Sequence, residues 1–113
     1  MAGVMRLRQA ISSWYSKKSS GALQYDPLNE VIVSNGGKQS LYQCFQALCS
    51  PGDEVIIPTP YWVSYPSIAK LAGATPVFVN TTADGGWKPS PADLLAAITP
   101  RTRILMLTNP SNP

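Results

Sequence analysis

The stretch EVIIPTPYWVSYPSIAKLAGATPVFV, residues 54–79, decides the fold class of this chain. It contains two short apolar runs, residues 55–57 and 77–79, and between them a helical pattern that ends near Gly73. The runs are continuous rather than alternating, which is typical of strands that helices cover on both faces. A strand, a helix and a second strand in this order predict a right-handed crossover between parallel strands.

The same alternation continues on both sides of this stretch. An apolar run at residues 31–33 predicts another strand, and the helix after it has a predicted buried stripe with the spacing i, i+3, i+4 and i+7: Leu41, Cys44, Phe45 and Leu48. Ser90 is a predicted N-cap, with Pro91 at the first helical position and Asp93 at the third. Residues 104–107 form the last run. The sequence therefore predicts an α/β fold in three layers, a mostly parallel sheet with helices on both faces.

Composition excludes several classes of function. The chain has 113 residues, 44% of them hydrophobic, which is enough for the core of one domain. Its net charge is only +3 and no aromatic platform is interleaved with the basic residues, so we expect no nucleic-acid partner. No apolar run reaches the ~18–20 residues of a membrane-spanning helix, so we expect no membrane partner. The chain has no histidine, and Cys44 and Cys49 lack the spacing of a zinc knuckle, which excludes histidine acid–base chemistry and His/Cys metal sites.

Residues 1–25 allow two interpretations. They contain no acidic residue, four basic residues and five serines, a composition typical of an organellar transit peptide. They also carry one apolar helical face over roughly residues 4–18: Val4, Leu7, Ile11 and Trp14. We favour the folded helix, and expect a cytoplasmic protein, with a plastid protein as the alternative.

Three segments follow predicted strands at the edge of the sheet where open α/β folds bind ligands. The first, residues 34–39, contains Gly36, Gly37 and Lys38 directly before a helix. Two glycines allow the backbone to curl around an anion, and the helix presents free N–H groups, so this loop is a candidate phosphate site. A tight strand-to-helix turn that needs glycine only for its geometry is the alternative.

The other two segments carry Trp62 and Asn112. Trp62 could stack on a flat aromatic ligand or could belong to the core. The two Asn-Pro steps in residues 109–113 exclude a helix there, and their asparagines could form turns or direct an amide at a ligand. A phosphorylated aromatic cofactor would use all three segments together.

Five motifs give the chain a resemblance to class I aminotransferases that depend on pyridoxal phosphate. Within that class it most resembles the bacterial and plastid type of aspartate aminotransferase, including the aspartate/prephenate enzymes. The motifs are NGGKQSL (35–41), PGDEVIIP (51–58), PYWVSYP (60–66), LAGATPV (71–77) and NPSNP (109–113). Residues 2–11 also resemble the helix that precedes the first strand in this family.

The resemblance implies roles for individual residues. Gly36, Gly37 and Lys38 would hold the phosphate of pyridoxal 5'-phosphate, mainly through backbone N–H groups. Trp62 would stack on the pyridine ring and contribute to the substrate site. Asn112 would donate its amide to the phenolic oxygen of the cofactor and lie beside the substrate carboxylate. The resemblance also implies cis peptide bonds at Thr59–Pro60 and at Asn112–Pro113.

The resemblance further implies that residues 1–113 are part of the large, cofactor-binding domain, without the small domain and the N-terminal arm. The Schiff-base lysine of the family lies outside this stretch, because neither Lys38 nor Lys70 is in a Ser-rich lysine motif. The chain by itself would be an inactive piece of a homodimeric enzyme that moves an amino group from aspartate to 2-oxoglutarate. Prephenate or another amino acid pair is an alternative substrate choice, and a noncatalytic α/β phosphate-binding module is the alternative of another class.

Overall fold

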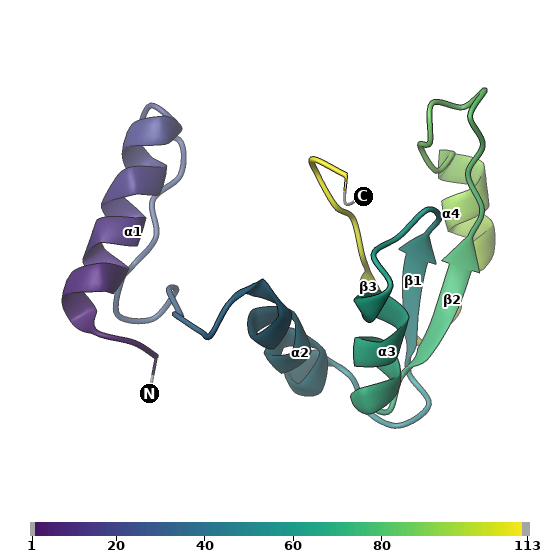
Figure 1. The fold of residues 1–113 in the computed structure, drawn as a ribbon, viewed down its shortest axis with the longest axis horizontal. Helices are drawn as coiled ribbons and strands as arrows, with labels where there is room; N and C mark the ends of the chain where they lie inside the picture. Colours follow the sequence, from purple (N-terminus) through teal and green to yellow (C-terminus); the bar gives the residue numbers. More distant parts are fainter. Residues whose placement is uncertain (1, 112–113) are drawn as a thin grey trace. The chain divides into compact units, whose positions relative to one another are not determined.

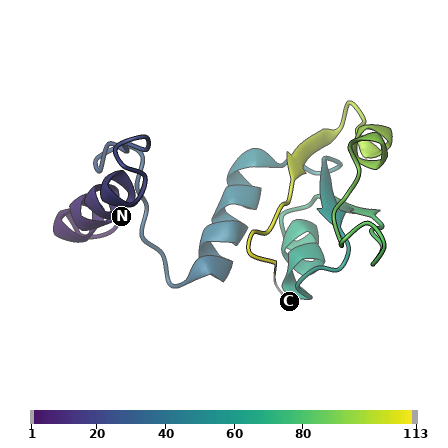
Figure 2. The same cartoon turned by 90° about the horizontal axis from the view of Figure 1, so that it is seen from above.

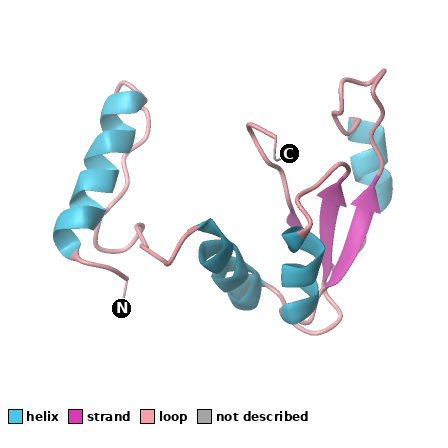
Figure 3. Cartoon of the chain, in the orientation of Figure 1, coloured by secondary structure: helices cyan, strands magenta, loops and turns pink. Residues whose placement is uncertain are grey.

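The computed structural model describes residues 2–111 and divides the chain into two compact units, Met1–Ser40 and Leu41–Pro113. Each unit is described by itself. The helices and strands are drawn in Figures 1 and 3. In chain order they are α1 (Met5–Lys18), α2 (Gly37–Leu48), β1 (Glu54–Pro58), α3 (Ser64–Leu71), β2 (Thr75–Val79), α4 (Pro91–Ala97) and β3 (Thr102–Leu105). None of the helices in the described part of the chain has the length and apolar character needed to cross a bilayer.

The second unit is built on a parallel sheet in the order β2-β1-β3. β1 is the middle strand, and Val55, Ile56 and Ile57 on it are almost completely buried. α3 connects β1 to β2 as the predicted crossover, and α4 lies on the other side of the strands from α3 (Figure 2). The predicted α/β fold with a parallel sheet and helices on both faces is confirmed.

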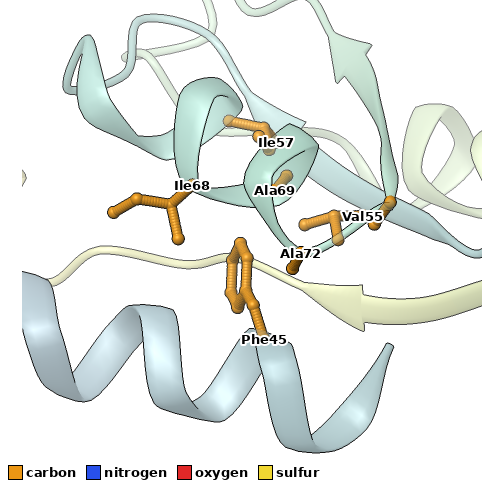
Figure 4. Close-up of a cluster of buried hydrophobic side chains, with 7 residues drawn as sticks. Phe45, Val55, Ile57, Ile68, Ala69 and Ala72 are labelled. Carbon is orange, nitrogen blue, oxygen red and sulfur yellow. The ribbon is translucent and has the colours of Figure 1, made fainter. Parts of the chain in front are cut away.

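One hydrophobic cluster joins α2 and α3 to one face of the sheet. Figure 4 shows Phe45 of α2 directed toward the side chains of α3 and β1. The buried members of this cluster are Phe45, Val55, Ile57, Ile68, Ala69, Ala72 and Ala74. The cluster holds the strands in place, and the carboxyl ends of the strands carry part of the predicted site.

The predicted buried stripe of α2 is wrong at two positions. Cys44 is exposed and Leu48 is 62% exposed, whereas Phe45 is buried. The residues that pack against the cluster are Leu41, Phe45 and Cys49, at i, i+4 and i+8. The i, i+4 row of the helix therefore faces the sheet, and the neighbouring row with Cys44 and Leu48 does not.

The first unit contains α1, which confirms the predicted helix, and the apolar face of α1 is largely exposed within residues 1–113. Val4 is 71% exposed and Trp14 is 52% exposed. The buried residue of α1 is Arg8, whose Nε donates a hydrogen bond of 2.8 Å to the carbonyl of Val31 and whose Nη2 donates to the carbonyl of Leu28. A buried guanidinium requires such acceptors, so the polar face of α1 faces the following loop.

The predicted strand at residues 31–33 is not formed. Val33 donates a backbone hydrogen bond of 3.0 Å to Ala2, and Val31 is buried, but no strand ladder develops there in the described residues. The carbonyl of Val31, which a ladder would use, accepts from Arg8 instead. An apolar run becomes a strand only where a neighbouring backbone pairs with it.

Glu54 begins β1 and is held by partners from the segment before β3. The Thr99 hydroxyl donates to Glu54 Oε2 at 2.6 Å, and Arg101 donates to Oε1 through Nη2 at 2.7 Å and Nε at 3.0 Å. These hydrogen bonds, that from Thr99 first, lower the pKa of Glu54 from its ordinary value of 4.5. The carboxylate therefore ties the first residue of the middle strand to the loop that leads into its neighbour.

We expect the Glu54 carboxylate to make the free energy of unfolding depend on pH in the acid range. A carboxyl group with a lowered pKa in the folded state stabilises the fold above its unfolded pKa and loses that effect as the pH falls through its folded pKa. The stability difference between the wild type and Glu54→Gln should therefore be constant near neutral pH and shrink below about pH 4.5. Urea titrations of both proteins across this range measure it, and a difference that stays constant into the acid range contradicts the assignment.

Candidate functional site

The predicted site residues fall in three places. Gly36, Gly37 and Lys38 belong to the first unit, where α2 begins, and Trp62 belongs to the second unit, in the loop after β1. Asn112 and the Asn112–Pro113 bond lie outside the described residues. The structure thus describes the glycine loop and the Trp62 loop separately.

The glycine loop is ordered by its own hydrogen bonds. Gly36 has φ +84°, a left-handed conformation that favours glycine, and its carbonyl accepts from the N–H groups of Gln39 at 3.2 Å and Ser40 at 3.3 Å. The side chain of Gln39 reaches back and accepts from the Asn35 N–H at 2.6 Å. The hydroxyls of Ser34 and Ser40 are hydrogen-bonded to each other across the loop. Hydrogen bonds within the chain therefore fix the conformation of this loop.

The chemistry of this loop fits a phosphate. The first N–H groups of a helix lack partners within the helix and carry its positive dipole end, and α2 has no acidic residue in its first turn. The sequence has no acidic residue between Glu30 and Asp53, and it places Lys38 in that first turn. A Cβ atom built on Gly36 or Gly37 would meet no other atom within 4 Å, so the outer side of the backbone is open to a ligand. These donors and this charge suit an oxyanion and would repel a cation.

The loop after β1 is fixed by Thr59. Its N–H donates to the Val79 carbonyl at 2.9 Å, its Oγ1 accepts from the Thr81 N–H at 3.1 Å, and its carbonyl accepts from the Thr81 hydroxyl. The Thr59–Pro60 peptide is cis, which confirms the prediction; Asn109–Pro110 is also cis. Trp62, three residues after Thr59, is half-buried.

Two aromatic residues near Trp62 make contacts on either side of β1. Tyr61 contacts β2, and Tyr65 contacts the segment after β3. Tyr61 stacks on Phe78 of β2, with ring centroids 5.1 Å apart and planes 17° from parallel. Tyr65, in the first turn of α3, accepts a hydrogen bond of 3.3 Å at its hydroxyl from Thr108, which follows β3. Sequence reasoning did not single out these contacts or those of Thr59. The available signal was a threonine one or two residues after each of the three runs that become strands: Thr59, Thr81 and Thr108.

A small pocket of about 80 Å³ adjoins this loop. Its lining includes Thr59, Tyr61, Tyr65, Trp87 and Thr108. This volume is below the ~150 Å³ of a cavity that holds one benzene ring, so the pocket by itself is too small for an aromatic cofactor. Trp87 is 58% exposed and has φ +57°. Within residues 2–111, no three His, Cys, Asp or Glu side chains gather as a metal site.

Comparisons with known proteins match essentially the whole chain to one protein family. The sequence model of the family described as "Aminotransferase class I and II" matches residues 1–113. A bifunctional aspartate aminotransferase and glutamate/aspartate-prephenate aminotransferase of Petunia hybrida is 49% identical, over 99% of this chain and 23% of the relative. An aspartate/prephenate aminotransferase of Nitrosomonas europaea is 48% identical, over 100% of this chain and 28% of the relative.

A solved structure has the same fold as this chain. The aspartate aminotransferase from Thermus thermophilus with maleate matches with a TM-score of 0.92 and 44% identity, and the match covers 99% of this chain and 28% of the solved chain. The chain thus spans about a quarter of the length of the relatives that it matches.

Proposed function

The chain belongs to the aminotransferase class I and II family, and on this premise we propose that it is part of an enzyme that transfers an amino group from aspartate to 2-oxoglutarate. Enzymes of this family use pyridoxal 5'-phosphate. What supports aspartate most is the identity of 48–49% along nearly the whole chain to relatives named for aspartate and prephenate transamination. Family members act on amino acids and 2-oxo acids and form dimers, and we extend both properties to this protein.

The glycine loop supplies the first part of the mechanism. We propose that the loop at Gly36, Gly37 and Lys38 holds the cofactor phosphate, with the helix dipole of α2 behind it. The N–H groups of Gly37 and Lys38 would donate to the phosphate, whereas the N–H of Gly36 donates to the Ser34 carbonyl at 2.9 Å and orders the loop. The loop is already ordered by the bonds at Gly36 and Gln39, so binding costs little conformational entropy. A phosphate held there fixes one end of the cofactor.

Two further residues complete the proposed site. In this proposal Trp62 would cover the face of the pyridine ring, and Asn112 would donate its amide to the phenolic oxygen and orient the substrate carboxylate. When bound, pyridoxal phosphate supplies the electron sink that makes the proton next to the amino group acidic. The residues of this chain bind and orient, and no lysine of the chain is assigned the role of the nucleophile.

The complete protein should transaminate, and residues 1–113 alone should not. We expect the complete protein, with pyridoxal phosphate, aspartate and 2-oxoglutarate, to produce oxaloacetate, whereas residues 1–113 give only the rate of the free cofactor. The reason is that a lysine outside the matched motifs must form the covalent bond to the cofactor. A coupled assay for oxaloacetate measures both.

The same assay separates the alternatives. Prephenate as amino acceptor is a second candidate, because both curated relatives carry prephenate in their names. Faster consumption of prephenate than of 2-oxoglutarate would assign it as the preferred acceptor. A complete protein that binds phosphate but transaminates nothing would favour a noncatalytic module instead.

A further inference from the structure

The loop that carries Trp62 leaves the middle strand of the sheet. Because β1 pairs with β2 on one side and β3 on the other, all in parallel, this loop lies between the segments that follow the two outer strands. The segment after β2 contacts the loop itself through Thr81, and the segment after β3 contacts Tyr65, in the first turn of α3, through Thr108.

The contact on the β2 side is direct. The Thr81 hydroxyl donates to the carbonyl of Thr59, and its backbone N–H donates to the hydroxyl oxygen of Thr59 at 3.1 Å. Together with the bond from Thr59 N–H to Val79, these contacts use every polar atom of Thr59. The beginning of the loop is thereby fixed against β2.

The contact on the β3 side acts through Tyr65. The Thr108 hydroxyl donates to the Tyr65 hydroxyl at 3.3 Å, and the N–H of Tyr65 donates to the carbonyl of Trp62 at 3.0 Å. The ring of Tyr65 packs against the hydrophobic cluster, so its hydroxyl has little freedom. The far end of the loop, at Trp62, is thereby connected to the segment after β3.

Neither hydroxyl is needed for the sheet. Thr81 lies beyond the last residue of β2 and Thr108 beyond that of β3, so the strand ladders do not use them. Thr59, Tyr65 and Thr108 also line the pocket of about 80 Å³. The two hydroxyl hydrogen bonds therefore act on the loop and on Tyr65 rather than on the strand ladders.

From these contacts we propose that Thr81 and Thr108 are positioning residues that hold the Trp62 loop from both sides and so set how Trp62 meets the cofactor ring. The inference rests on the proposed function, because it takes the ring as the partner of Trp62. A hydrogen bond that orders such a loop in the free protein improves affinity, because less conformational entropy is lost when the cofactor binds.

The test uses Thr81→Val, Thr108→Val and the double variant in the complete protein, with Thr99→Val as the matched control. Thr99 makes its hydrogen bond to Glu54 at the opposite end of β1, so its loss affects the fold but not the Trp62 loop. The readouts are the dissociation constant for pyridoxal phosphate, the circular dichroism of the bound cofactor in its own absorption band, and the melting temperature.

We expect each of the two variants to weaken cofactor binding by about two- to tenfold and to change the circular dichroism band, and the double variant to exceed both. Thr99→Val should lower the melting temperature with both cofactor readouts unchanged. Tyr65→Phe removes the acceptor of Thr108 and should reproduce Thr108→Val, with no added effect when the two are combined.

The outcomes separate the inference from the proposed function. A wild-type protein without a cofactor band overturns both. A wild type that binds the cofactor, with Thr81→Val and Thr108→Val indistinguishable from Thr99→Val in affinity and dichroism, overturns only the positioning role.

Discussion

Replacement of Phe45 by alanine should lower the free energy of unfolding by about 3–5 kcal/mol. The Phe45 ring is 1% exposed and is the contribution of α2 to the buried cluster with Val55, Ile57 and Ile68. Its removal loses the transfer free energy of the ring and leaves a cavity that the small neighbours Ala69 and Ala72 fill poorly. Since domains are stable by about 5–15 kcal/mol, a large share of the stability would be lost. Urea unfolding of the complete protein measures the change.

Leu48→Ala is the matched control on the same helix. Within residues 1–113 Leu48 is 62% exposed, and surface substitutions usually change stability by less than about 0.5 kcal/mol. The sequence pattern places both residues in one stripe, whereas the structure separates them. Equal losses for Phe45→Ala and Leu48→Ala would support the stripe predicted from the sequence and contradict the observed core.

The alternation of apolar runs predicted the sheet correctly because buried parallel strands are apolar on both faces. Residues 55–57, 77–79 and 104–107 fall on or directly beside β1, β2 and β3. Residues 31–33 have the same composition but form no strand. The sequence of an apolar run does not determine whether a neighbouring backbone segment pairs with it. In this case the guanidinium of Arg8 takes the carbonyl of Val31, a contact between residues 23 positions apart that no local pattern reveals.

The candidate site was predictable where it depends on local backbone and not where it depends on contacts across the sheet. Gly36, in the loop where the sequence indicates that glycine is needed for backbone geometry, has φ +84°. The bonds of Thr81 and Thr108 join residues 22 and 43 positions apart along the chain. Each threonine follows its apolar run closely, but only the strand order β2-β1-β3 shows that both meet the loop of the middle strand.

Two alanine substitutions in the glycine loop decide between a phosphate site and a turn. Gly36→Ala should lower the free energy of unfolding by about 1–2 kcal/mol, because an L side chain is strained at φ +84° although space is available. Gly37→Ala should leave stability unchanged or raise it by up to about 1 kcal/mol, because Gly37 begins α2 without a positive φ and a Cβ there meets no atom. The turn interpretation predicts nothing further for Gly37→Ala.

The phosphate interpretation adds an effect of Gly37→Ala on binding. A methyl group between the backbone and the phosphate would weaken hydrogen bonds to a charged group, which contribute about 1.5–3 kcal/mol, or about 10- to 150-fold in affinity. We therefore expect Gly37→Ala to fold as the wild type and to bind pyridoxal phosphate that much more weakly. Binding of pyridoxal, which lacks the phosphate, should be unchanged, because the ring contacts are elsewhere. If fluorescence titrations give Gly37→Ala the wild-type affinity for pyridoxal phosphate, the glycines serve the turn alone and the cofactor phosphate is held by other residues.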